Sequence, residues 1–188
     1  MAAVVEVRRH SLRGEGGSLS PEGVALAERA RATLLGNYQA CYSSPKLRAR
    51  ETLEAFGVTT YTVIDAFSTF PKEIDDHGDH VRALQERTGC TVLEAYLAIP
   101  ATHLVVERVG QQFFAKLCEL AAELRPRRNA LVVSHGGSIE AAVLAAMPDW
   151  TLDDLGGELA VCEAACFHFH DHVFRDVSFI RLGDGGGS

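Results

Sequence analysis

The chain has 188 residues, a length that suits one domain, and hydrophobic residues make up 47% of it. Its formal net charge of −7 argues against nonspecific nucleic-acid binding, which needs a basic surface. No apolar run reaches the ~20 residues that span a bilayer, and the N-terminal run is charged too soon for a signal peptide, so we expect a cytoplasmic protein without membrane or nucleic-acid partners.

The first half of the chain alternates short apolar runs with helical patterns. Ser20 is a suitable N-cap and Pro21 a suitable first residue for a helix. A polar, glycine-rich loop precedes this helix at 11–17. The expected elements are a strand at 3–7, a helix from Ser20 to about Leu35, a strand at 39–42, a helix at 46–56 and a strand at 58–65.

The second half begins with a segment that is harder to interpret, at 67–102. It contains an acidic, turn-rich patch at 72–80 and two short helical patterns near 81–88 and 92–98. The elements expected after it are a long helix at 107–124, a buried strand at 130–133, a helix at 138–146 and a hairpin of strands at 160–170 and 173–182. This repeated order of strand and helix predicts an α/β three-layer sandwich with a mostly parallel central sheet.

Polar residues follow three of the expected strands directly. They lie in the segments 8–11 (RRHS), 43–50 (SSPKLRAR) and 134–137 (SHGG). Each segment alone also fits a surface pair, a helix cap or a simple turn. Because ligands of open α/β sheets bind at the carboxyl ends of the strands, three such segments at one edge indicate a functional site.

The residue types in these segments suit a phosphoryl group. Arginine presents a planar fork that matches phosphate oxygens, and helix N-termini offer free N–H groups. A neutral imidazole is an accepted covalent nucleophile, and a second imidazole, if protonated, would stabilise the transferring group. We therefore expect phosphoryl-transfer chemistry at this edge.

With these motifs, the chain resembles the histidine phosphatase superfamily, also called phosphoglycerate mutase-like. The matching elements are 9–11 (RHS), 19–23 (LSPEG), 43–52 (SSPKLRARET) and 134–137 (SHGG), and they occur in the family's order over most of the chain. In size and motif pattern the chain is most similar to the small bacterial phosphohistidine phosphatases. The resemblance implies the phosphoglycerate mutase-like fold.

The resemblance also implies roles for individual residues. His10 would be the nucleophile that becomes phosphohistidine, and Arg9, Arg48 and His135 would hold the phosphoryl group. The remaining substrate contacts would come from Ser11, Ser44 and Gly136. The implied reaction is hydrolysis of a phosphomonoester or phosphoramidate, on a phosphorylated small molecule or a phosphoprotein, without a metal or organic cofactor.

Two positions depart from the family's pattern. Ser11 replaces the usual glycine after the first histidine, and Thr69 stands about where larger members carry a glutamate that acts as general acid. Among the nearby carboxylates, Glu73 is our first choice for the acid, although a plain solvated acidic loop also explains it. Gly136 occupies the position at which another branch of the family carries its acid, which disfavours that branch.

The resemblance sets expectations for domain organisation and leaves alternatives open. We expect a single domain at 1–182, in which about 67–102 is an insertion over the active site, and a flexible tail at 183–188. A phosphoglycerate mutase is disfavoured by chain length and by Thr69. A non-catalytic protein that binds a phosphorylated ligand, and a homodimer, are not excluded by the sequence.

Two further features have simpler interpretations. Arg8 alternates with Arg9 on its strand, so only one of them should face the site, and we expect Arg8 at the surface. His168, His170 and His172 would align for a divalent metal on a continuous strand. We expect a turn at 171–172 to break that alignment.

Overall fold

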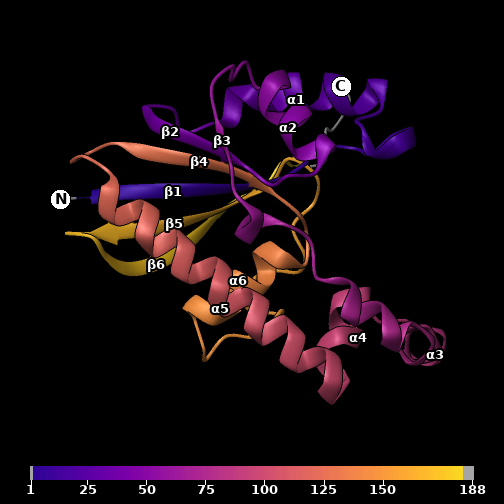
Figure 1. The fold of residues 1–188 in the computed structure, drawn as a ribbon. Helices are drawn as coiled ribbons and strands as arrows, with labels where there is room; N and C mark the ends of the chain where they lie inside the picture. Colours follow the sequence, from indigo (N-terminus) through magenta and orange to yellow (C-terminus); the bar gives the residue numbers. More distant parts are fainter. Residues whose placement is uncertain (1, 184–188) are drawn as a thin grey trace.

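The computed structural model describes residues 2–183, so that only the first residue of the tail expected at 183–188 lies within the described part. The chain forms a six-stranded sheet with the strand order β3-β2-β4-β1-β5-β6. The neighbouring strands β3, β2, β4 and β1 run parallel, and β5 and β6 run antiparallel to their neighbours. Figure 1 shows helices on both sides of this sheet, which confirms the expected α/β sandwich.

The elements follow one another in the order that the sequence predicts. The strands are β1 (Ala2–Arg9), β2 (Tyr38–Ser43), β3 (Thr62–Val63), β4 (Asn129–Ser134), β5 (Ala164–His170) and β6 (Val173–Ile180). The α-helices are α1 (Pro21–Ala30), α2 (Leu47–Ala55), α3 (Gly78–Thr88), α4 (Val92–Ala98), α5 (Pro100–Glu123) and α6 (Ser138–Ala146). Short 3-10 helices are η1 (Glu15–Gly17), η2 (Arg31–Thr33), η3 (Asp65–Phe67) and η4 (Lys72–His77).

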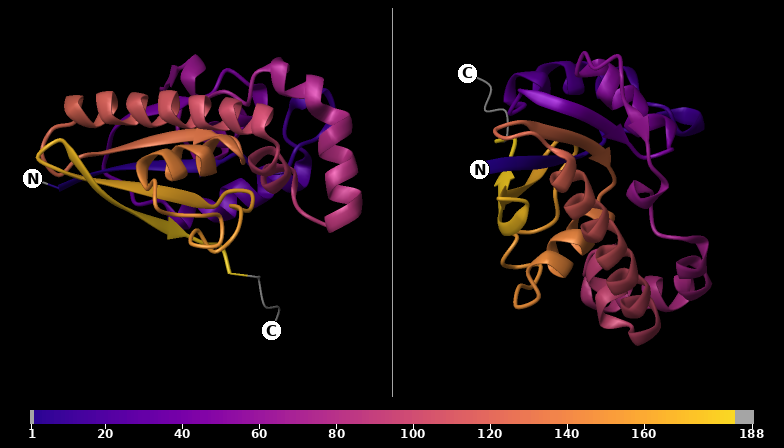
Figure 2. Two further views of the ribbon diagram at one scale, coloured as in Figure 1. Left: turned by 90° about the horizontal axis from the view of Figure 1, so that it is seen from below. Right: turned by 60° about the vertical axis from the view of Figure 1, so that its left-hand side comes forward.

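The central strand β4 is buried on both faces, and its side chains alternate between the two helical layers. Ala130 and Val132 belong to the core under α5 and α6, whereas Leu131 and Val133 belong to the core under α1 and α2. Strands covered on both faces are apolar at every position rather than at every second one. The two views of Figure 2 show α5 lying lengthwise along the sheet.

Close contact between α5 and α6 depends on Gly110. A Cβ atom at this position would lie 2.3 Å from the carbonyl oxygen of Ala141 on α6. A third apolar cluster, which includes Ile74, Leu93 and Val106, packs η4 and α4 against the first half of α5. The segment between β3 and α5 is thereby held beyond the carboxyl ends of the parallel strands (Figure 1).

Several expected boundaries are wrong. Helix α1 ends at Ala30 rather than near Leu35, and β5 begins at Ala164 rather than at 160. The strand expected at 58–65 is only the two residues of β3. The N–H of Val58 donates to the carbonyl of Leu53, so Val58 belongs to the end of α2. Helix α5 begins at Pro100 rather than at 107, since proline is well suited to the first helical position. The predicted N-cap of α1 is confirmed, because the Ser20 hydroxyl accepts a hydrogen bond from the N–H of Gly23.

Arg8 is fully buried, so its expected place at the surface is wrong. The face of β1 that carries the Arg8 side chain is covered by the α1–α2 layer and not by solvent. There its Nε donates to Glu6 at 2.6 Å, and its Nη1 donates to the hydroxyl of Thr33 and the carbonyl of Cys162. A buried guanidinium is tolerated because a buried carboxylate and several acceptors surround it.

The hairpin between β5 and β6 turns at Asp171 and His172, as predicted. Both residues have positive φ angles, 50° and 63°, as two-residue hairpin turns require. The imidazole of His172 contacts the carbonyl of Ala121 on α5 and is not aligned with His168 and His170. Within residues 2–183, no helix is long and apolar enough to cross a membrane.

Candidate active site

Strand order brings the three polar segments together. Strand β4 lies between β1 and β2, and all three run parallel, so their carboxyl ends meet at one edge of the sheet. The N–H of His10 donates to the carbonyl of Ser134 at 2.9 Å, and the N–H of Ser44 donates to that of Val133 at 3.0 Å. The loops after β1 and β2 are therefore fixed directly to β4.

The hydrogen bonds of His10 determine which ring nitrogen is free to react. Its Nδ1 lies 2.6 Å from the carbonyl oxygen of Ser11, which can only accept, so Nδ1 carries the proton. Its Nε2 accepts a hydrogen bond from Nε of Arg48 at 2.9 Å. The lone pair of Nε2 therefore points toward a guanidinium.

Arg48 bridges the two imidazoles. It is the second residue of α2, and its Nη2 donates to Nδ1 of His135 at 3.1 Å. Since Nδ1 of His135 accepts, its Nε2 carries the proton and donates to the hydroxyl of Ser44 at 2.6 Å. The ring centroids of His10 and His135 are 5.1 Å apart.

Burial keeps both imidazoles neutral at pH 7. Desolvation lowers the pKa of His10 to about 4, with smaller contributions from the charges of Arg48 and Arg9 in the same direction. The same cause lowers the pKa of His135 to about 2, with Arg48 as the largest charge contribution. An anion placed between the two rings would act in the opposite direction and favour their protonated forms.

Arg9 lies against the loop after β4. A Cβ atom at Gly136 would be 2.8 Å from Cζ of Arg9, so the glycine allows the guanidinium to approach the backbone. Its Nη1 donates to the carbonyl of Leu159. Its Nε is buried and has no hydrogen-bond partner among residues 2–183. Arg9 therefore brings a positive charge to the site, where it lowers the pKa of both imidazoles.

Ser11 uses its polar groups to fix the loop that carries His10. Its hydroxyl donates to the carbonyl of Gly23 on α1 at 2.6 Å, and its N–H donates to the hydroxyl of Thr52 on α2 at 3.0 Å. The Thr52 hydroxyl in turn donates to the carbonyl of Arg48 at 2.7 Å. Ser11 thus connects the loop that carries His10 to both helices of one layer.

A cavity of about 460 Å³ lies beside the site. Lys46, whose charge contributes to the lowered pKa of His135, forms part of its wall. Asp65 and Arg108 line it as well, and Glu73 lies on η4 in an ion pair with Arg108. The structure thus places Glu73 next to the cavity wall and brings Asp65 to the cavity itself.

Sequence reasoning gave no role to two cations near the site. The charge of Arg13 lowers the pKa of both His10 and Arg48, although burial has the larger effect on each. Lys46 acts similarly on His135. The available signals were a cation three residues after His10 in the glycine-rich loop and a lysine directly after the Ser-Ser-Pro element.

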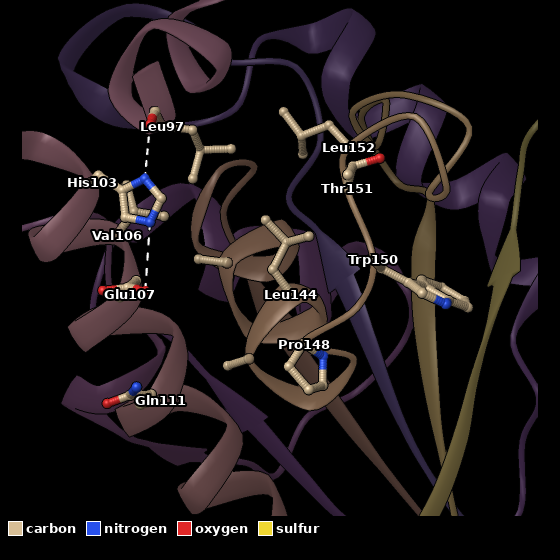
Figure 3. Close-up of a pocket in the computed structure, with 12 residues that line it drawn as sticks. Leu97, His103, Val106, Glu107, Gln111, Leu144, Pro148, Trp150, Thr151 and Leu152 are labelled. Atoms are coloured by element: carbon tan, nitrogen blue, oxygen red, sulfur yellow. Dashed lines mark hydrogen bonds and ion pairs between the residues drawn. The ribbon is translucent and has the colours of Figure 1, made fainter. Parts of the chain in front are cut away.

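A second hollow, of about 410 Å³, lies between α5, α6 and the loop that follows α6 (Figure 3). Its wall is mostly apolar and includes Leu144 and Trp150. His103 at its rim contacts the carbonyl of Leu97 and the carboxylate of Glu107. The imidazoles of the sheet edge are not part of this wall.

No protein-family model matches the chain, and no curated protein matches its sequence. Solved structures do match. Phosphoserine phosphatase from Entamoeba histolytica, in complex with 3-phosphoglyceric acid, superimposes with a TM-score of 0.63 at 17% identity and covers 96% of this chain and 98% of its own.

Two further solved structures are similar to the same extent. A phosphoglycerate mutase from Bacillus anthracis gives a TM-score of 0.64 at 20% identity, over 97% of this chain and 93% of its own. A mycobacterial glucosyl-3-phosphoglycerate phosphatase, in complex with VO3, gives 0.64 at 19% identity, over 92% and 96%. These likenesses confirm the expected fold over nearly the whole length of the chain.

Proposed function

We propose that this chain, which has the phosphoglycerate mutase-like fold, is a phosphatase that works through a phosphohistidine on His10. One observation carries the proposal most directly. The carbonyl of Ser11 fixes the tautomer of His10 so that the Nε2 lone pair faces Arg48, while burial keeps the ring neutral. A nucleophile that is unprotonated at pH 7 and surrounded by cations suits attack on a phosphoryl group.

The first step is transfer of the phosphoryl group to His10. The lone pair of Nε2 forms a bond to phosphorus, and the bond from phosphorus to the leaving oxygen or nitrogen breaks. Arg48 moves from Nε2 to a phosphoryl oxygen. Arg9 adds a second guanidinium charge, and His135 becomes a further donor when its Nε2–H turns from the hydroxyl of Ser44 to the phosphoryl group. Catalysis of this kind depends mainly on positioning and charge stabilisation.

The second step returns His10 to its free form. Water attacks phosphorus, the P–N bond breaks, and the electron pair returns to Nε2. A proton must reach the leaving group in the first step and leave the water in the second. We assign this acid–base role to Glu73, which reaches the cavity by exchanging its ion pair with Arg108 for the leaving group.

The cavity supports a phosphorylated small molecule as substrate. Its wall includes Lys46, Lys72 and Arg108, so it suits a leaving group that carries negative charge of its own. The structurally similar phosphatases have names that refer to phosphoserine and to glucosyl-3-phosphoglycerate. A phosphoprotein, whose phosphorylated side chain would enter the same cavity, is the alternative.

The nucleophile is tested by hydrolysis of p-nitrophenyl phosphate. We expect His10→Ala to reduce kcat by more than about a thousandfold, because the covalent route is lost. His168→Ala is the matched control, since His168 lies on β5 and contacts Ser178. Wild-type enzyme quenched in alkaline denaturant should also contain a phosphorus–nitrogen bond, visible by ³¹P NMR and lost on acidification. Retained activity in His10→Ala would refute the mechanism, and a wild type that binds phosphate without turnover would indicate a binding protein.

The acid is tested by comparing leaving groups. Glu73→Gln should slow hydrolysis of an alkyl phosphate by about a hundredfold and leave p-nitrophenyl phosphate nearly unaffected, because a good leaving group needs no proton. The measurement is kcat/KM for both substrates. Asp65→Asn is the comparison, since Asp65 lines the cavity directly. If Asp65→Asn shows this selectivity and Glu73→Gln does not, the role belongs to Asp65.

A further inference from the structure

Glu140 is a fully buried carboxylate close to the candidate site. It is the third residue of α6, and each of its oxygens accepts a backbone hydrogen bond. Oε2 accepts from the N–H of Gly137 at 2.6 Å, and Oε1 accepts from the N–H of Leu159 at 2.8 Å. Acceptance at both oxygens is the pattern of an ionised carboxylate. Glu140 thereby joins the loop after β4 to the loop before β5.

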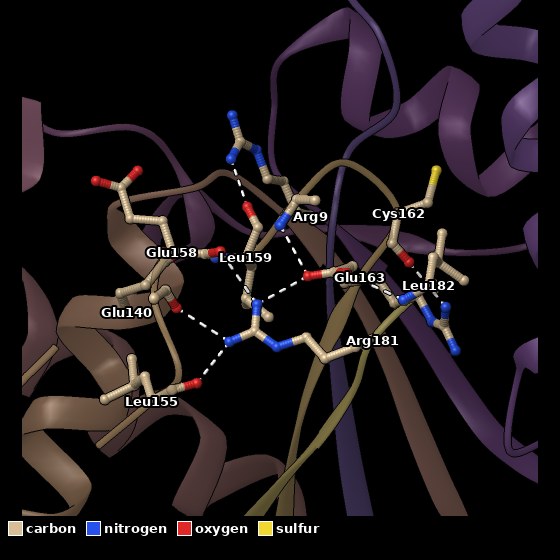
Figure 4. Close-up of polar contacts among 12 residues, drawn as sticks. Arg9, Glu140, Leu155, Glu158, Leu159, Cys162, Glu163, Arg181 and Leu182 are labelled. Atoms are coloured by element: carbon tan, nitrogen blue, oxygen red, sulfur yellow. Dashed lines mark hydrogen bonds and ion pairs between the residues drawn. The ribbon is translucent and has the colours of Figure 1, made fainter. Parts of the chain in front are cut away.

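Both of these loops contact Arg9. The carbonyl of Leu159 accepts from Nη1 of Arg9, and Gly136, the neighbour of Gly137, lies against the guanidinium. Figure 4 shows the Arg9 head group directed at the Leu159 carbonyl. One carboxylate therefore fixes the two pieces of backbone between which the arginine is held.

The loop before β5 needs such anchors, because residues 147–163 contain no regular helix or strand. Its outer part is held by Arg181, which follows β6 (Figure 4). Arg181 donates to the carbonyls of Leu155, Gly157 and Glu158 and to the carboxylate of Glu163. Glu140 holds the inner part of the loop, at the point where it meets Arg9.

We propose that Glu140 is a positioning residue for Arg9, a role that rests on the proposed phosphatase function. It holds Leu159 and the loop of Gly137 so that the guanidinium of Arg9 stays close to both imidazoles, whose pKa values its charge lowers. The carboxylate itself would repel a bound phosphate, so its presence there is explained by what it positions rather than by direct binding. Burial raises the pKa of Glu140, and the two N–H donors and the charge of Arg9 offset this only in part.

Glutamine is the informative replacement. Its amide has nearly the same size as the carboxylate, but it can accept through only one of its two terminal atoms. The other terminal atom is an NH₂ group, which would face the N–H of either Gly137 or Leu159. Glu140→Gln therefore releases one of the two loops without leaving a cavity.

The first measurement is kcat and KM for p-nitrophenyl phosphate. We expect Glu140→Gln to lower kcat about ten- to a hundredfold, because small displacements of a group that stabilises the transition state have effects of this size. Glu6→Gln is the matched control: Glu6 is an equally buried carboxylate, bonded to Arg8 on the opposite face of β1. It should lower the melting temperature and leave kcat of the folded protein unchanged.

The second measurement separates positioning from loss of stability. In an Arg9→Met background, Glu140→Gln should lower kcat less than about twofold, since residues that act through one another are not additive. Equal reductions in both backgrounds, or the same behaviour as Glu6→Gln, would overturn the role of Glu140. If Glu140→Gln does not fold, Glu140→Asp, which keeps the charge but cannot span both loops, takes its place in the same cycle.

Orthovanadate binding distinguishes a failure of this proposal from a failure of the proposed function. A wild type that neither hydrolyses aryl phosphates nor binds vanadate overturns both. If the wild type binds vanadate without turnover, the same variants are compared by vanadate affinity. A loss of about tenfold in Glu140→Gln, absent in the Arg9→Met background, supports positioning, and an unchanged affinity refutes it.

Discussion

At the scale of the residue, two opposing influences act on the proposed nucleophile. The carbonyl of Ser11 raises the pKa of His10, whereas burial and the charges of three arginines lower it, with burial the largest contribution. The result is an imidazole that is neutral at pH 7 without a neighbouring general base. A buried histidine between arginines would be unfavourable in the protonated form, and the same arrangement becomes favourable once a phosphoryl dianion is bound.

The low pKa of His10 predicts how stability changes with pH. The unfolded chain binds a proton at His10 below about pH 6.5, but the folded chain does so only below about pH 4. Between these values the unfolded state holds more protons than the folded state. The free energy of unfolding should therefore be highest above pH 6.5 with respect to His10, and should fall as the pH decreases toward 4. His135 acts in the same direction. Urea unfolding across this range measures the slope.

The matched variant for this prediction is His10→Gln, which removes the titrating ring. It should reduce the slope between pH 6.5 and 4 and leave the contribution of His135. A titration of the His10 ring by NMR provides an independent value, expected near 4. A midpoint near 6.5, or an unchanged slope in the variant, would show that the ring is better solvated than the structure indicates.

At the scale of the element, local sequence signals account for the parts of the fold that were predicted correctly. Helix α1 is specified by the Ser20 cap and by Pro21, and β4 by an apolar run that is buried on both faces. The start of α5 was missed because the helical pattern was traced from 107, although Pro100 marks the true first residue. The short β3 was overestimated, because a strand that pairs at only two positions depends on its neighbour rather than on its own sequence.

In the candidate site, too, residues placed by local sequence were predicted, whereas contacts between distant segments were not. His10, Ser44 and His135 could be placed because each follows a strand, and parallel strands align their carboxyl ends. The link through Leu159 could not, since its contacts with Glu140 and Arg9 join segments that are distant in the sequence. The burial of Arg8 was also invisible, because alternation assigns a face to a side chain but does not say what covers that face.

At the scale of the whole molecule, the overall charge and the local charge have opposite signs. The chain carries a net charge of −7, whereas the candidate site gathers Arg9, Arg13, Lys46 and Arg48. Exposed charges more than about 8 Å apart are largely screened at physiological ionic strength. The nearby cations therefore determine whether an anion binds, and the acidic remainder of the surface discourages nonspecific binding of polyanions.

Anion binding at this site should stabilise the whole fold, because the site joins β1, β2 and β4 with the first turns of α2 and α6. A ligand at about a hundred times its dissociation constant adds about 2.7 kcal/mol to the free energy of unfolding. For a chain of this size, that corresponds to a rise in melting temperature of about 5–10 °C. We expect orthovanadate to give this rise in a thermal scan and chloride at equal ionic strength to give none. Arg48→Met should abolish the rise, since both imidazoles lose the guanidinium that joins them; the same rise in that variant would place the anion elsewhere on the molecule.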